Sequence, residues 1–238
     1  MAIQLKDFTL LLLPGMDGTG DLFSDFIAAL PHDLQTARVR YPTDHFLSYS
    51  QLQNLVREKS PNSPFVLLAE SFSTPLALNY AATNPANLRA LILCAGFATS
   101  PLHGWRGHLA SRLAPLAFHI PLPAFAAKRW LLGPTAPPAL ISALRGAVSR
   151  VNPNVLSARI RAVLKCDARD SLSQTTVPIL YLRPNRDALV PAKCVEELRQ
   201  IKPQMQVALI EGPHLLLQRD PVASAHAVLA FIRTIASD

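Results

Sequence analysis

Acidic residues are missing from the middle of this chain. No Asp or Glu occurs between Ser71 and Cys166, although ten Lys and Arg residues lie there, whereas the rest of the chain holds 13 basic and 16 acidic residues. The basic residues are interleaved with Leu, Ala, Phe and Pro, and no nucleic-acid-binding motif is present. We therefore expect no nucleic acid as a partner, which leaves an anionic membrane surface or an acidic partner for this charge.

Cysteines and long apolar runs are also scarce. Cys94, Cys166 and Cys194 are odd in number and follow no metal-binding spacing, so we expect reduced thiols in a cytoplasmic protein, with no bound metal and no cofactor. The apolar run near the start, residues 8–13, is shorter than the core of a signal peptide or a membrane span. It is typical of a buried strand, and we expect no stable insertion into a membrane.

What the chain does have is an alternation of strand-like and helix-like patterns. Half of its 238 residues are hydrophobic and only 16% are charged, as in globular proteins. Strand-like segments occur at residues 8–13, 36–41, 65–69, 89–94, 177–183 and 205–210, with helical patterns between them. This alternation predicts an α/β fold with a doubly wound, mainly parallel sheet of about six strands, and chemistry at the carboxyl ends of the strands.

The strand pattern is interrupted once, between the fourth and fifth predicted strands. Residues 97–169 contain eight of the 21 prolines and several short apolar helical stretches. An ordinary crossover connection is shorter than this. We therefore predict that residues 1–96 and 170–238 form the core domain and that residues 97–169 form a helical lid inserted before the last two strands.

Three aromatic residues of this insertion have two possible roles. Trp105, Phe125 and Trp130 could line an acyl-binding pocket beneath the lid, or they could hold the lid together by packing.

The third predicted strand runs into a candidate nucleophile. Ser71 lies in the frame Ala69-Glu70-Ser71-Phe72-Ser73, a version of the Gly-x-Ser-x-Gly nucleophile elbow with small residues in place of both glycines. A tight turn from strand to helix exposes the serine hydroxyl at a helix N-terminus, which favours negative charge. The alternative is that Ser71 only caps the helix.

The loop after the first strand, Pro14 to Phe23, is rich in glycine and fits neither common nucleotide-binding fingerprint. Its glycines let the backbone approach a ligand closely, and Gly15 is a candidate substrate contact. An ester-cleaving serine needs two backbone amides for the oxyanion of its tetrahedral intermediate. We expect these from Met16 in this loop and from Phe72 after the nucleophile.

An acid and a histidine follow later strands. Asp187 lies shortly after the fifth predicted strand, and His214 lies directly after the sixth. The chain order of nucleophile, acid and histidine is that of the α/β-hydrolase fold. The imidazole would take the proton of the attacking hydroxyl, and the carboxylate would orient the imidazole. Among the other candidates, Asp17 could serve as a cap or turn residue, and His226 lies in the middle of a predicted helix.

Over nearly its whole length the chain resembles the α/β-hydrolase superfamily. Pro14-Gly15-Met16 stands in place of the usual oxyanion segment, Arg186 to Pro191 resembles the acid loop, and Gly212-Pro213-His214 resembles the histidine loop. The insertion length and the stretch Asp167 to Pro178 are similar to small carboxylesterases of the pimeloyl-carrier-protein methyl ester esterase type. The segment LPGMDGTG also resembles plastid acyltransferases that make phytyl esters.

These observations predict a serine carboxylesterase that acts on esters of short to medium acyl chains through an acyl-enzyme on Ser71. The expected substrate is a small ester, and an acyl chain on an anionic carrier is one candidate for it; no oligomeric state is predicted. The same triad also serves acyltransferases and acyl-thioesterases, and a non-catalytic binding protein on a hydrolase scaffold is a further alternative.

Overall fold

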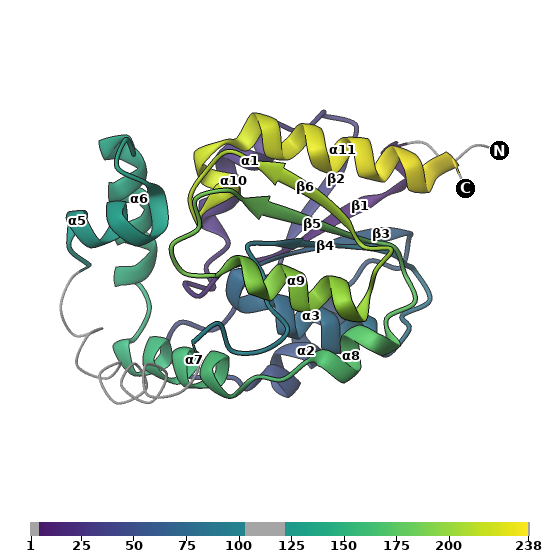
Figure 1. Ribbon diagram of the computed structural model, residues 1–238, viewed down its shortest axis with the longest axis horizontal. Helices are drawn as coiled ribbons and strands as arrows, with labels where there is room; N and C mark the ends of the chain where they lie inside the picture. Colours follow the sequence, from purple (N-terminus) through teal and green to yellow (C-terminus); the bar gives the residue numbers. More distant parts are fainter. Residues whose placement is uncertain (1–4, 103–121, 238) are drawn as a thin grey trace.

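The computed structural model describes residues 5–102 and 122–237. In this part of the chain, six strands form one parallel sheet in the order β2-β1-β3-β4-β5-β6 (Figure 1). The strands are β1 (Thr9–Leu13), β2 (Gln35–Arg38), β3 (Phe65–Glu70), β4 (Leu88–Cys94), β5 (Ile179–Pro184) and β6 (Gln206–Ile210). The predicted α/β class, strand number and parallel sheet are confirmed.

The second strand is shorter than the segment 36–41 that the sequence indicates. The backbone N–H of Val39 still bonds to Leu12, but the N–H of Tyr41 donates to the carbonyl oxygen of Gly18 instead (2.8 Å). The chain therefore leaves the sheet after Val39 and bonds to the glycine-rich loop that follows β1.

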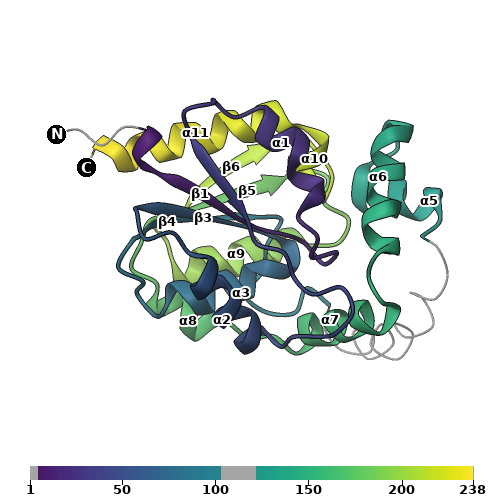
Figure 2. The ribbon, with the colours of Figure 1, turned by 180° about the vertical axis from the view of Figure 1, so that it is seen from behind.

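Helices cover both faces of the sheet (Figures 1 and 2). One layer contains α2 (Tyr49–Lys59), α3 (Thr74–Ala81), α8 (Arg169–Gln174) and α9 (Ala192–Ile201). The other layer contains α1 (Ser24–Ala28), α10 (Leu216–Arg219) and α11 (Pro221–Ser237). The chain also has short 3-10 helices, namely η1 (Leu5–Asp7), η2 (Asp21–Phe23) and η3 (Ser71–Ser73).

Alternate residues of each strand face opposite sides of the sheet and pack against different helix layers. In β3, Leu67 packs with the side of α2 and α3, and Val66 and Leu68 pack with the side of α1 and α11. Because successive side chains of a strand point to opposite faces, a continuous apolar run such as this one must be buried on both sides.

Residues 97–169 lie between β4 and β5, and we call them the cap segment; they form no strand within their described parts, 97–102 and 122–169. Their helices are α5 (Ala124–Ala126), η4 (Ala127–Leu132, with π-helical hydrogen bonds), α6 (Pro138–Ser149) and α7 (Pro153–Lys165). In Figures 1 and 2, α5 and α6 stand beyond the end of the core toward which β5 and β6 point.

The cap segment contacts the core at defined points. The N–H of Leu215, next to His214, donates to the carbonyl oxygen of Leu131 (3.0 Å), and the N–H of Asn152 donates to that of Thr43 (2.8 Å). Among the described helices, we find none that is both long and apolar enough to cross a bilayer.

Candidate active site

The chain turns sharply where β3 ends. Ser71 has a φ of 48°, in the left-handed region that non-glycine residues rarely adopt, and the chain then continues through η3 into α3. Backbone strain of this kind is concentrated where a functional side chain is held in place. Ala69 and Ser73 are fully buried on either side of the turn, so residues of this size fit where the elbow motif has glycine.

Ser71, His214 and Asp187 form one hydrogen-bonded chain. His214 Nε2 lies 2.8 Å from Ser71 Oγ, and His214 Nδ1 lies 2.8 Å from Asp187 Oδ2. The imidazole and carboxylate side chains are only 4% and 5% exposed. In the neutral tautomer with its proton on Nδ1, the imidazole donates to Asp187 and leaves Nε2 to accept the serine hydroxyl proton. The structure thus brings together all three residues singled out in the sequence.

The loop after β5 holds the carboxylate of Asp187 in a fixed orientation. Asp187 Oδ1 accepts hydrogen bonds from the backbone N–H groups of Leu189 (2.8 Å) and Val190 (2.9 Å), which leaves Oδ2 for His214. The N–H of Arg186 donates to the carbonyl oxygen of Gly212 at 3.0 Å. The acid loop and the histidine loop are therefore bonded directly to each other.

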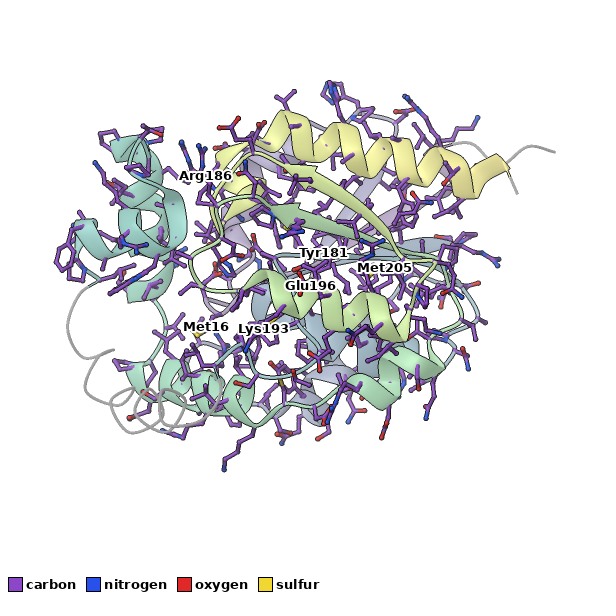
Figure 3. All side chains as sticks on the ribbon, in the orientation of Figure 1. Met16, Tyr181, Arg186, Lys193, Glu196 and Met205 are labelled. Atoms are coloured by element: carbon purple, nitrogen blue, oxygen red, sulfur yellow. The ribbon has the colours of Figure 1, made fainter. Side chains whose placement is uncertain are left out.

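The glycine-rich loop after β1 lies beside Ser71. Gly15, Met16 and Phe72 line the same cavity as Ser71 and His214. Figure 3 labels Met16 on the side of the core where β5 and β6 end. The loop residues expected to bind the oxyanion and the substrate are therefore next to the candidate nucleophile.

This cavity has a volume of about 240 Å³ and is mostly apolar. The cap segment contributes aliphatic side chains to it, among them Leu102, Leu131, Leu144, Val148, Ile160, Val163 and Leu164. Among the described lining residues, only Asp17 and His214 are ionisable. The described lining contains no Lys or Arg that could pair with an anionic substrate group, so it matches an uncharged hydrocarbon group.

Two aromatic residues are not where the sequence interpretation puts them. Phe125 is 72% exposed and Trp130 is 47% exposed, so neither lines the cavity at Ser71 nor packs inside the cap segment. They lie along a separate groove, and the residues that η4 buries are Ala127 and Leu132, in a cluster with Leu215. Trp105, the third aromatic candidate, lies outside the described residues.

Two carboxyl groups are buried near the candidate nucleophile. Burial raises the pKa of Glu70 to about 7, with the amide of Gly15 and the side chain of Gln218 beside it. Burial also raises the pKa of Asp17, although hydrogen bonds from Thr19 act in the opposite direction. Desolvation favours the neutral form of a carboxyl group, so the site carries less negative charge than its composition indicates.

Arg159, on α7, is a residue that the sequence analysis missed. It is 2% exposed and contacts the loop that carries Met16. A signal was present, since Arg159 falls on the apolar face of its helix, four residues after Val155 and four before Val163. A charged residue in that register indicates a buried partner.

Within residues 5–102 and 122–237, no three His, Cys, Asp or Glu side chains are grouped so that they could hold a metal ion.

No family model matches the chain. It is 29% identical over 117 residues to a pimeloyl-[acyl-carrier protein] methyl ester esterase of Vibrio vulnificus strain YJ016, which covers 48% of this chain and 46% of that protein. The chain thus aligns with about half the length of the curated relatives it matches.

Solved structures match over almost the whole chain. A thermophilic esterase from Thermogutta terrifontis has a TM-score of 0.80 at 19% identity, covering 96% of this chain and 90% of its own. An esterase from Exiguobacterium antarcticum has a TM-score of 0.80 at 14% identity, covering 94% and 91%. At such identities the likeness concerns the fold. Together with the parallel six-stranded sheet, these likenesses show that the chain has the α/β-hydrolase fold.

Proposed function

We propose that this protein is a serine carboxylesterase that hydrolyses carboxylic esters through an acyl-enzyme intermediate. The observation that carries the proposal is the buried chain of hydrogen bonds from Ser71 through His214 to Asp187. A serine hydroxyl is a weak nucleophile until a base takes its proton, and this arrangement provides the base and the group that orients it.

In the proposed reaction, Ser71 Oγ attacks the ester carbonyl while its proton passes to His214 Nε2. The imidazolium that forms is stabilised by Asp187, and it then protonates the leaving alcohol. In the second half, His214 takes a proton from water, whose oxygen attacks the acyl carbon. The acid is released, and Ser71 regains its proton.

The tetrahedral intermediates carry a negative charge on the former carbonyl oxygen. We assign its stabilisation to the backbone N–H groups of Met16 and Phe72, whose residues line the cavity beside Ser71. Losing one such donor typically lowers kcat by about 10²- to 10³-fold.

The cap segment would act as a helical lid that shapes the acyl site. Its aliphatic side chains make up much of the cavity lining, which favours an uncharged acyl group of short to medium length. In this proposal, residues 1–96 and 170–238 are the catalytic core, and residues 97–169 set which acyl group enters.

A carrier-linked ester is the finer proposal for the natural substrate. The relative from Vibrio vulnificus is named for a pimeloyl ester on an acyl-carrier protein. In this chain, the groove that holds Phe125 and Trp130 has a volume of about 570 Å³. Its described lining residues include four cations from the cap segment and the core, namely Lys128, Arg129, Arg186 and Arg219. Ala188 and Pro213, each next to a residue of the hydrogen-bonded chain, also line it. Its charge suits an anionic carrier.

The proposal is tested with purified protein, a series of p-nitrophenyl esters of increasing chain length and the matching acyl-thioesters. We expect turnover of the p-nitrophenyl esters and labelling of Ser71 by a fluorescent fluorophosphonate. Ser71→Ala should abolish both, while Ser173→Ala, an exposed serine in α8, should change neither. Faster cleavage of the thioesters would favour an acyl-thioesterase, and no labelling of the wild type would contradict the proposal.

A further inference from the structure

Arg159 is a buried cation that donates three hydrogen bonds to backbone carbonyl groups. Its Nη1 donates to the carbonyl oxygens of Met16 (2.8 Å) and Asp17 (2.9 Å), and its Nη2 donates to that of Pro42 (2.8 Å). The guanidinium carbon also lies 5.7 Å from the ring centre of Tyr41 and 5.9 Å from that of Phe72. Helix α7 thus reaches into the core next to the candidate nucleophile.

Removing the guanidinium of Arg159 from water costs free energy, which its hydrogen bonds must offset. Burial lowers the pKa of Arg159, whereas Tyr41 and Asp17 raise it. A buried charge is tolerated only where its donors are satisfied. The guanidinium packs against Gly18, where an added Cβ would lie 2.7 Å from Nη1, so the absence of a side chain at this position lets the guanidinium reach the loop.

The contacts fix the turn that carries Met16. The N–H of Gly18 donates to the carbonyl oxygen of Gly15 at 3.1 Å, which orients the peptide between Gly15 and Met16. In a trans peptide the N–H points opposite to the carbonyl oxygen, so the N–H of Met16 is directed out of the turn. Arg159 donates to the carbonyl oxygens of the next two peptides, those of Met16 and Asp17. Each peptide from Gly15 to Gly18 is therefore oriented by a hydrogen bond to its carbonyl oxygen.

We propose that Arg159 is a positioning residue that sets the direction of the Met16 N–H in the oxyanion hole. Arg159 is not among the residues that line the cavity at Ser71, so it acts through the turn and not on the substrate. Because it belongs to α7, the oxyanion hole is complete only when this cap helix is seated on the core. This inference rests on the proposed esterase function.

The competing interpretation is that Arg159 only anchors the cap segment. Asn152 and Arg150 also attach this segment to the core, through Thr43 and through Asp21, respectively. A pure anchor would change the thermal stability and the KM when it is lost. Loss of a positioning residue would lower kcat, because the Met16 amide stabilises the transition state and not the bound ester, and a misdirected amide no longer does so.

The test compares Arg159→Met with Arg161→Met. Methionine keeps a long apolar side chain without donors, and Arg161 is a partly buried arginine on the same helix. With a p-nitrophenyl ester, we expect Arg159→Met to lower kcat by about 10- to 100-fold, somewhat less than the loss of a whole oxyanion donor, with little change in KM. Arg161→Met should keep the wild-type kcat.

Chemical rescue is the second arm. In Arg159→Ala the side chain leaves a space, and guanidinium ion at millimolar concentration should restore kcat several-fold while having no effect on Arg159→Met, which fills the space. If neither variant folds by circular dichroism, Arg159→Lys decides, because lysine keeps the charge but has no planar fork for three carbonyl groups, and kcat should again fall.

The outcomes separate this inference from the proposed function. A wild-type protein that cleaves no ester overturns the proposed function and this inference with it. An active wild type combined with an undiminished kcat in the folded Arg159 variants overturns this inference alone. So does a loss confined to KM and thermal stability.

Discussion

The side-chain hydroxyl of Ser73 donates a hydrogen bond to the carbonyl oxygen of Pro14. This contact joins the turn that carries Ser71 to the loop that carries Met16, and the hydroxyl of Tyr41 lies 2.6 Å from the same Ser73 oxygen. A serine in place of the second glycine of the elbow therefore links the candidate nucleophile to the candidate oxyanion loop.

We expect Ser73→Ala to lower both stability and activity. The change leaves the buried carbonyl oxygen of Pro14 and the hydroxyl of Tyr41 without this partner, so the free energy of unfolding should fall by about 2 kcal/mol. The kcat should fall by less than the roughly 10²-fold loss of a whole oxyanion donor. Urea unfolding and ester kinetics measure the two effects.

The matched control for that variant is Tyr41→Phe, which keeps the contact between Ser73 and Pro14. Its unfolding free energy should fall by only about 1 kcal/mol, and its kcat should stay at the wild-type value. Equal losses of kcat in both variants would contradict the role given to the Ser73 contact.

The orientation of His214 depends on Asp187. In Asp187→Asn, the amide NH₂ can donate to Nδ1, which favours the tautomer with its proton on Nε2 and removes the base for Ser71. We expect kcat for a p-nitrophenyl ester to fall by about 10³- to 10⁴-fold near neutral pH, while the protein stays folded. Asp170→Asn, at an exposed position in α8, serves as the control and should leave kcat unchanged. A loss below tenfold would argue against the assigned acid.

Glu70 should make stability depend on pH. Its pKa is raised to about 7 in the folded state, whereas an ordinary glutamate releases its proton near the unperturbed value of 4.5. The protonated Glu70 of the folded state therefore favours folding at low pH. As the pH rises through about 7 this contribution is lost, and the free energy of unfolding should fall by about 3 kcal/mol in total.

The variant Glu70→Gln should remove that dependence. We expect its free energy of unfolding to change less than that of the wild type between pH 5 and pH 8, as measured by urea denaturation in matched buffers. Glu58→Gln, an exposed position on α2, should follow the wild-type curve. Parallel curves for wild type and Glu70→Gln would show that Glu70 ionises normally.

The cationic groove should matter only for an anionic carrier. We expect Lys128→Glu with Arg129→Glu to raise the KM for a carrier-linked ester about tenfold and to leave p-nitrophenyl acetate unaffected. Raising the salt concentration should have the same selective effect on the wild type. The double change Arg57→Glu with Lys59→Glu, on α2, is the control for net charge. An equal response of both substrates would remove the carrier from the proposal.

The sequence was sufficient to predict the parallel sheet and to predict that Ser71, Asp187 and His214 lie close together. Each follows a strand-like segment, and the carboxyl ends of parallel strands meet at one edge of a sheet. Local turn and strand patterns therefore predict which distant residues lie together, and the hydrogen bonds between these three side chains agree with that prediction.

The directions of side chains on the cap helices could not be predicted in the same way. Phe125 and Trp130 fit an acyl pocket by composition, yet both are exposed, because the buried residues of this part of the chain are Ala127 and Leu132, in a cluster with Leu215. Which side of a short helix is buried depends on the surface it packs against, and that surface comes from another part of the chain.

Periodicity and spacing in the amino-acid sequence thus determined the fold class and the candidate nucleophile, base and acid, because these follow from local patterns and strand order. The tertiary structure alone decided that Ser73 bonds to Pro14 and that Arg159 holds the turn of Met16. Both contacts join residues far apart in the chain, and such pairs are selected by packing and by the need to satisfy buried polar groups, which no local pattern encodes.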